Sequence, residues 1–212
     1  MILVHATLPS SIEDIKKHGL VSSKKIISTM LVAEYQNKYR PKFFPAFMDM
    51  KKCIYFYCSQ DTKIISRLYV QDVKYVQVRS QDLDPQKLYV ARKNDSDTIA
   101  RVIAKVINTY RSGQSITMND NELIEISKSN SYKEYLKDKS NCIKDYWNSI
   151  IPFKQYEIER NAMSWREKIM NHSLETEILY FGDISHNNID SVKDFISMND
   201  WFDEDIANGF SI

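Results

Sequence analysis

Two glutamates precede an apolar segment late in the chain. Glu175 and Glu177 are two residues apart, so on a strand they point to the same face. Residues 178–181, which follow, are strand formers that stop at Gly182 and Asp183. A carboxylate at the mouth of a buried strand loses hydration and needs a reason to be there, whereas one at a solvated strand start needs none. Spacing alone favours the solvated alternative, so the rest of the chain has to decide.

Several common catalytic patterns are absent from the sequence. The four glycines lie far apart and cannot form a phosphate-binding loop, and the four histidines lack the spacing of zinc ligands. No Gly-x-Ser-x-Gly elbow is present. An active site must therefore be assembled from strand ends that are distant in sequence.

Three strand ends carry polar side chains suited to such a site. His5 closes an N-terminal apolar strand, Tyr55 lies in an aromatic strand, and Glu177 opens the late strand. Taken singly, each has an ordinary structural explanation. A histidine after a strand is commonly a hydrogen-bonding partner, and an aromatic strand is commonly part of the core.

The elements that must position these residues follow an irregular order. Strands are expected at residues 2–4, 53–58, 73–78, 87–91 and 178–181. Helices are expected at residues 10–19, 29–39, 61–68, 97–110 and 188–196, and residues 115–160 are expected to be mainly helical with a break at Pro152. Strands, a helical interruption and one late strand predict an α+β fold, because regular βαβ alternation is missing.

The composition favours a folded, soluble protein. The chain has 212 residues, of which 43% are apolar and 27% charged, which suits one domain with a full core. The three cysteines show neither metal nor disulfide spacing, which favours a reduced intracellular setting. No signal peptide or membrane span is visible. We therefore expect a cytoplasmic protein that binds no metal and does not act at a membrane.

Positive charge is concentrated in one segment. Between Lys38 and Lys52 five basic residues face a single acidic one, Asp49. Phenylalanines are interleaved with them, in a stretch at 41–49 that we expect to be a packed loop. Cations attract phosphates and aromatic rings stack on bases, so this pattern is typical of a nucleic-acid contact. A solvated loop is the alternative.

Taken in order, His5, Tyr55 and Glu177 resemble the ADP-ribosyltransferase superfamily. Its NAD-binding core has a His on the first strand, a Tyr on a later strand and a Glu on a late strand. Residues 3–7, Leu-Val-His-Ala-Thr, and the helix that ends in His-Gly-Leu at 18–20 look like the family's first strand and helix. The other two motifs are Cys-Ile-Tyr-Phe at 53–56, with cysteine in place of the family's glycine, and the Glu-led strand at 177–184.

The resemblance implies a fold more specific than α+β. We expect one domain over residues 1–212 with an ADP-ribosyltransferase-like split β-sheet core and flanking helices. A mainly helical insertion, at about 115–165, would precede the late catalytic strand.

The resemblance also implies a role for each residue toward NAD. Glu177 would stabilise the oxocarbenium-like ribosyl cation that forms when nicotinamide leaves, and would bond a ribose hydroxyl. His5 would bond the ribose next to the adenine, and Tyr55 would stack on the nicotinamide ring. Ala6 or Thr7 would help to hold the amide.

Two further residues receive roles from the same likeness. Tyr57, on the strand of Tyr55, is assigned to the NAD site. Glu175 completes a Glu-x-Glu pair that is characteristic of members that modify arginine. Those members usually begin with arginine where this chain has His5, so Glu175 is expected to be at most a helper on the acceptor side.

The DNA ADP-ribosyltransferase toxins offer a closer likeness. They combine a His-x-Thr start, a basic helix, a Tyr-Phe strand and an Arg-Glu-Lys run before the catalytic Glu, and this chain has corresponding residues at 5–7, 38–40, 55–56 and 166–168. An arginine of the basic helix takes part in catalysis there. Arg40 is the nearest candidate, with Arg67 behind it and a surface helix charge as the alternative for Arg40. The family's Ala-Glu-Phe-Leu strand is Thr-Glu-Ile-Leu here, and its Pro-Met-Leu-Tyr segment is not recognisable.

We therefore expect a mono-ADP-ribosyltransferase that transfers ADP-ribose from NAD to a macromolecule, with DNA or RNA slightly favoured over a protein as acceptor. Two alternatives stay open. The RNA 2′-phosphotransferase branch of the same fold needs an Arg and His cluster that the chain does not show. A non-catalytic binding module would keep the fold and lack the chemistry.

Overall fold

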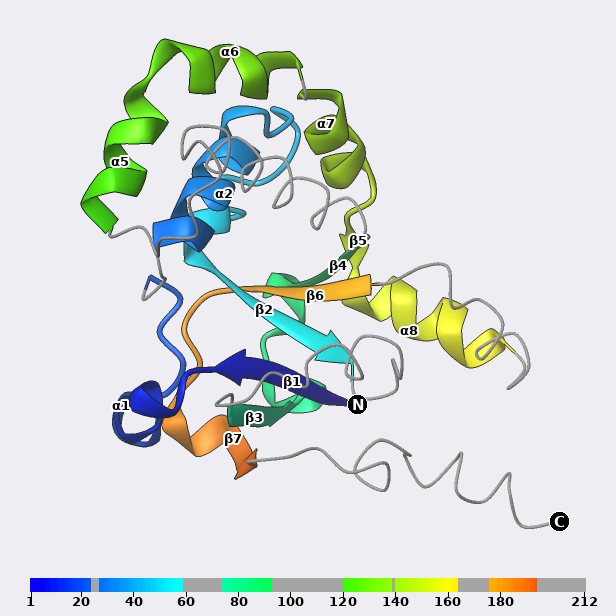
Figure 1. The fold of residues 1–212 in the computed structure, drawn as a ribbon. Coiled ribbons are helices and arrows are strands. Elements are labelled where there is room, and N and C mark those ends of the chain that lie inside the picture. Colours follow the sequence, from blue (N-terminus) through cyan, green and yellow to red (C-terminus); the bar gives the residue numbers. More distant parts are fainter. Residues whose placement is uncertain (24–26, 59–73, 93–119, 139, 164–175, 194–212) are drawn as a thin grey trace, which may run out of the picture.

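Strands from both halves of the chain form one antiparallel sheet (Figure 1). The computed structural model describes residues 1–23, 27–58, 74–92, 120–138, 140–163 and 176–193. Across the described residues the sheet has seven strands in the order β5-β4-β6-β2-β1-β3-β7. The strands are β1 (Ile2–Thr7), β2 (Cys53–Cys58), β3 (Lys74–Arg79), β4 (Leu88–Arg92), β5 (Ile151–Pro152), β6 (Thr176–Phe181) and β7 (Ile189–Lys193).

Helices cover the sheet unevenly. The α-helices are α1 (Ile12–His18), α2 (Ile27–Lys38), α5 (Asp120–Lys128), α6 (Asn130–Asp138), α7 (Ser140–Asn148) and α8 (Phe153–Ala162). Figure 1 shows α2, α5, α6 and α7 together on one side of the sheet, and we call these four the helical layer. No described helix is long and apolar enough to cross a membrane. The combination of these helices with an antiparallel sheet confirms the predicted α+β class.

Short 3₁₀ turns connect several of these elements. They are η1 (Pro9–Ser11), η2 (Met50–Lys52), η3 (Ser80–Asp82), η4 (Pro85–Lys87) and η5 (His186–Asn188). Of these, η2 leads directly into β2, and η5 separates β6 from β7.

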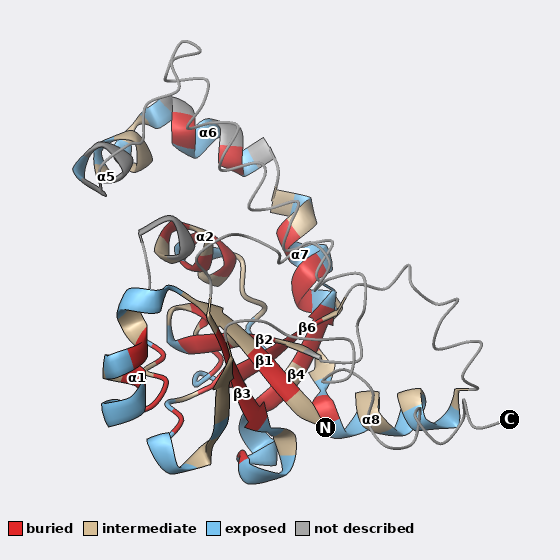
Figure 2. Cartoon of the chain, turned by 60° about the horizontal axis from the view of Figure 1, so that its bottom comes forward, coloured by how far each residue is buried: buried red, intermediate tan, exposed pale blue. Residues whose placement is uncertain are grey.

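Strand alternation sends neighbouring side chains into two separate cores. On β2, Cys53 packs toward the helical layer and Ile54 packs on the other side of the sheet. Figure 2 shows buried positions along the strands and on the sheet-facing parts of α2 and α7. The helix-layer core consists of Ala33, Tyr35, Met48, Met50, Cys53, Ala91, Tyr132, Leu136, Ile143, Tyr146, Trp147, Ile150, Leu179 and Phe181. The opposite core consists of Leu3, Ile12, Ile15, Leu20, Ile54, Phe56, Val76, Val78, Leu83, Leu88, Val90, Phe153, Ile178, Tyr180 and Ile184.

The helical interruption is confirmed where the structure describes it. Helices α5, α6, α7 and α8 lie within residues 120–162, and the break expected at Pro152 falls in the short strand β5, just before α8 begins. The helices expected at 61–68 and 97–110 lie outside the described residues.

The final helix expected at 188–196 is wrong for its described part, because residues 189–193 form the edge strand β7. Ile189 and Val192 are three apart, a spacing typical of one helix face. The register of β7 on β3 shifts between Gln77 and Val78, so a bulge places Ile189 and Val192 against the same core. The spacing that is typical of a helix face is therefore produced here by a bulge in a strand.

The N-terminal helix ends in a tight contact with the late strand region. Gly19 has φ +82°, and a Cβ there would lie 1.9 Å from the carbonyl oxygen of Ile184. Leu20 and Ile184 exchange backbone hydrogen bonds of 2.9 Å in both directions. Helix α1 starts after Ser11 without a side-chain cap bond, and this backbone contact at its end fixes it to the late strand region.

Candidate functional site

The three strand-end residues lie on consecutive strands in the middle of the sheet. His5 is on β1, Tyr55 on β2 and Glu177 on β6, and these strands are neighbours in that order (Figure 1). Tyr55 pairs with Leu179 across β2 and β6, so Glu177 is its diagonal neighbour on the same face. Residues that are far apart in sequence are thus brought onto adjoining strands.

The strands β1 and β2 pair over a short stretch and then diverge toward the C-terminal end of β1 (Figure 1). Their pairs are Leu3 with Cys58 and Val4 with Tyr57. By contrast, β1 pairs with β3 along its whole length. We call the diverging part, where residues 5–7 of β1 lie beyond the β1–β2 pairing, the β1–β2 seam.

His5 is the first residue of this seam and bridges it. Its Nδ1 bonds the carbonyl oxygen of Tyr55 over 2.9 Å. A carbonyl oxygen can only accept, so Nδ1 carries the proton and Nε2 of the neutral ring is an acceptor. The bond fixes the orientation of the ring at the point where the strands part.

The side chains of the three residues do not share one face. Alternation along β1 places His5 on the side of Leu3, and its ring meets Phe56 edge-on with centroids 5.9 Å apart. Tyr55 and Glu177 lie on the side of the helical layer. Of the neighbours of His5, alternation puts Thr7 on the same side of β1 and Ala6 on the other.

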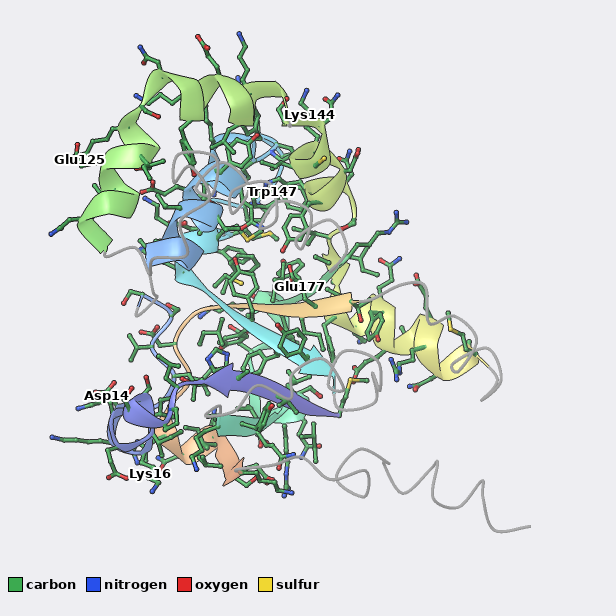
Figure 3. All side chains as sticks on the ribbon, in the orientation of Figure 1. Asp14, Lys16, Glu125, Lys144, Trp147 and Glu177 are labelled. Carbon is green, nitrogen blue, oxygen red and sulfur yellow. The ribbon has the colours of Figure 1, made fainter. Side chains whose placement is uncertain are left out.

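Glu177 is buried rather than solvated. Glu177 is 5% exposed, and the residues that follow it on β6 are apolar and buried. The hydroxyl of Tyr146 on α7 donates to its Oε1 over 2.5 Å. Figure 3 shows Glu177 between β6 and the helical layer, near Trp147. The solvated alternative is therefore wrong for Glu177, and Glu175 lies outside the described residues.

The hydroxyl of Tyr55 points into the same interior. It donates to Oε1 of Gln36 over 3.4 Å and lies 3.9 Å from Sδ of Met50. Burial raises the pKa of Tyr55, and electrostatic interaction with the ionisable groups of Cys53, Glu177 and Asp49 raises it further, in that order. Tyr55 is therefore a protonated donor at neutral pH. Tyr57, two residues on along β2, is half-buried and pairs with Val4 at the closed end of the seam.

Gln36 and Tyr146 are site residues that sequence reasoning missed. Gln36 is fully buried on α2, and its Nε2 finds no acceptor among the described residues. Burial, followed by the charge of Glu177, raises the pKa of Tyr146, so it too remains a donor. The sequence could have indicated Tyr146 only through the need of buried polar groups for hydrogen-bond partners. A tyrosine on an apolar helix face needs a partner for its hydroxyl, and a buried carboxylate needs a donor.

Arg40 lies at the base of the loop that follows α2. Its Nη1 donates to the carbonyl oxygens of Ala46 and Met48, at 3.2 Å each. In this position Arg40 holds the loop, and its hydrogen bonds within the described part of the chain go to the loop and not to Glu177. Residues 67 and 166–168, also named by the resemblance, lie outside the described residues.

The loop at 41–49 is only partly packed, so the expectation of a packed loop is wrong for two of its rings. Phe44 contacts Trp147 with centroids 5.0 Å apart. Phe43 and Phe47 are 77% and 44% exposed. Lys42 and Lys52 are exposed in and beside the loop. Aromatic rings and cations therefore share one surface.

Comparison with known proteins gives no relative from which a role could be transferred. No protein-family model matches the chain, and searches of curated proteins and of solved structures find no match. In the part of the chain that the structure describes, no group of three or more His, Cys, Asp or Glu side chains could hold a metal ion.

Proposed function

We propose that the chain is a mono-ADP-ribosyltransferase that transfers ADP-ribose from NAD to a macromolecular acceptor. The observation that carries the proposal is the burial of Glu177 on the strand beside Tyr55, whose carbonyl in turn binds His5. Burying a carboxylate is costly, so a carboxylate that is kept in an apolar strand calls for a functional explanation. The strands that carry the three residues are neighbours in the sheet, which supports the proposal.

Glu177 would act on the charge that develops in the reaction. The bond from ribose C1 to the nicotinamide nitrogen breaks, its electron pair leaves with nicotinamide, and positive charge grows on the ribose. A carboxylate in a buried, weakly polarisable site stabilises such charge more than one in water does. The acceptor then attacks C1 and completes the transfer.

The β1–β2 seam would hold NAD. Nε2 of His5, an acceptor once Nδ1 is bonded to Tyr55, suits a ribose hydroxyl. The ring of Tyr55 offers a stacking surface for nicotinamide, with Tyr57 on the same strand. Thr7 or the backbone of Ala6, on the diverging end of β1, would help to hold the amide.

The exposed loop favours nucleic acid as the acceptor. Phe43 and Phe47 can stack on unpaired bases, and Lys42 and Lys52 can contact phosphates. Single-stranded DNA or RNA fits this surface better than a duplex, because stacking requires splayed bases. A protein acceptor is the alternative outcome of the test.

The function is tested with labelled NAD and separate pools of DNA, RNA and protein. Label should enter one nucleic-acid pool as nicotinamide is released. Glu177→Gln should bind NAD with modest loss and turn over about 10²- to 10³-fold more slowly, since the carboxylate acts mainly in the transition state. Glu125→Gln, an exposed glutamate of α5 paired with Lys128, is the matched control. Unchanged turnover in Glu177→Gln removes Glu177 from the mechanism.

The same assay separates the alternatives. A non-catalytic module binds NAD and releases no nicotinamide. A 2′-phosphotransferase consumes NAD only when RNA with a 2′-phosphate is supplied. For the acceptor, Phe43→Ala should raise the KM for nucleic acid about 5- to 100-fold, the equivalent of one stacked base. Ile158→Ala, at a 62% exposed position on α8, should leave it unchanged. Label in the protein pool alone makes the acceptor a protein.

A further inference from the structure

Tyr146 lies on α7, a helix for which the sequence pattern predicts only that it covers the sheet. Its ring is fully buried, and Glu177 beneath it is 5% exposed. The 2.5 Å separation between the hydroxyl oxygen and Oε1 of Glu177 is that of a bond to an ionised acceptor. The bond joins residues on α7 and β6 that are 31 positions apart.

We propose that Tyr146 is a positioning residue that holds the Glu177 carboxylate in its working orientation, so that the helical layer completes the active centre. The proposal rests on the proposed function, in which Glu177 faces the ribosyl cation. It assigns to α7 a part in catalysis beyond covering the sheet.

One hydrogen bond suffices for this role because of the geometry of a carboxylate. A carboxylate has two oxygens with several acceptor positions, so a bond at Oε1 is compatible with a further bond to a ribose hydroxyl. A glutamate side chain has much rotamer freedom to lose. When Tyr146 fixes one oxygen, the carboxylate is aligned before the substrate arrives, and the reaction avoids that entropy loss.

The next residue of α7 anchors the helix that carries Tyr146. Nε1 of Trp147 donates to the backbone oxygen of Gln36 over 2.9 Å, and the side chain of Gln36 accepts the hydroxyl of Tyr55. Consecutive residues of α7 therefore bind Glu177 and the α2 residue that holds Tyr55. The side chains proposed for the nicotinamide ring and for its ribose, Tyr55 and Glu177, are therefore both held by residues of α2 and α7.

The test compares two tyrosine-to-phenylalanine variants of the full chain. Tyr146→Phe should lower kcat for nicotinamide release about 10- to 100-fold, the equivalent of one hydrogen bond to a charged group, with the KM for NAD changed less than about threefold. Tyr132→Phe, a buried tyrosine of α6 in the same layer, should leave both constants unchanged. Tyr146→Phe with wild-type kcat overturns the proposal, and so does an equal loss in the two variants.

A second measurement needs no turnover. A fluorine NMR signal from 3-fluorotyrosine at position 146, which keeps the ring and the hydroxyl, should shift in Glu177→Gln and again when NAD binds. A signal that ignores Glu177→Gln overturns the contact, and one that ignores bound NAD overturns the positioning role, with NAD binding checked separately by calorimetry. If the wild-type chain binds NAD but releases no nicotinamide, the proposed function fails, while the response to Glu177→Gln still decides the contact.

Discussion

The two faces of the sheet bury different kinds of side chain. The opposite core is formed mainly by aliphatic residues, with Phe56, Phe153 and Tyr180. The helix-layer core surrounds a carboxylate, an amide and several hydroxyls, namely Glu177, Gln36, Tyr55 and Tyr146. Strands β2, β4 and β6 contribute to both cores, and the polar side chains of the helix-layer core come from β2 and β6 as well as from α2 and α7.

The two cores are expected to differ in how much their buried side chains stabilise the fold. A buried polar network contributes little net stability, and a member without a partner is costly. Nε2 of Gln36 is such a member among the described residues. The opposite core has the simpler composition of a structural support. Both faces therefore stabilise the fold. The proposed bond-breaking step, which depends on Tyr55 and Glu177, belongs to the side of the helical layer, whereas His5 lies on the other side.

The largest expected effect comes from removing the central aromatic residue of the helix-layer core. Trp147 is fully buried, stacks near Phe44 and donates to Gln36. Trp147→Ala should lower the free energy of unfolding by about 3–5 kcal/mol, because the lost ring leaves a cavity and the carbonyl oxygen of Gln36 keeps only its bond from the backbone nitrogen of Tyr39. Denaturant unfolding measures this loss. Trp147→Phe keeps most of the volume and should lose clearly less, and equal losses would show that packing of the ring contributes little.

Two adjacent residues of β6 test the comparison directly. Ile178 and Leu179 are both fully buried, Ile178 in the opposite core and Leu179 in the helix-layer core. Alanine at either position should lower the free energy of unfolding by about 2–5 kcal/mol. Leu179 pairs with Tyr55. Leu179→Ala should therefore slow nicotinamide release about tenfold more than Ile178→Ala does, since misplacement near a reacting centre is costly.

Urea unfolding and steady-state rates, both taken at a temperature where each variant stays folded, measure the pair. Similar stability losses with unequal rates support the assignment of the reaction to the helical-layer side. Equal rate losses would mean that the two faces contribute alike, and the comparison would then describe packing only.

Most of the strands could be predicted from the types of residue in each segment alone. The strand at 53–58 has four β-formers in a row between two cysteines, and its expected bounds agree with β2. The helix predicted at 188–196 was wrong for residues 189–193 because a bulge shifts the register of the strand that forms there. The partner strand that imposes the bulge is more than 100 positions away in sequence. A spacing rule cannot contain that information.

The candidate site was predictable in part for the same reason. Three ordered motifs located β1, β2 and β6, which proved to be neighbours in the sheet. The contact of Tyr146 with Glu177 was not predictable, because it depends on how α7 packs over the sheet. Nor does spacing show that His5 and Glu177 lie on different faces, since that follows from how the strands pair.

The smallest expected effect concerns the edge of the opposite core, where Asp183 follows β6. Ser22 donates to it from both its hydroxyl and its backbone nitrogen, at 2.7 Å each. These bonds lower the pKa of Asp183 below its ordinary value of 3.8, because they favour the ionised form. Stability from this contact is therefore present above the ordinary pKa and is lost as the pH falls through the lowered one.

Asp183→Asn should accordingly lower the free energy of unfolding at neutral pH by about 1 kcal/mol or less, a hydrogen bond to a charged acceptor reduced by its exposure to water. The difference from wild type should shrink below pH 4, where the wild-type carboxylate becomes protonated. Thermal unfolding between pH 3 and pH 7 measures it, with Asp145→Asn, an exposed carboxylate of α7, as the control. A pH-independent difference would mean that Ser22 holds the side chain by shape alone, whereas the expected pH dependence would show that a charge outside the proposed site also serves the fold.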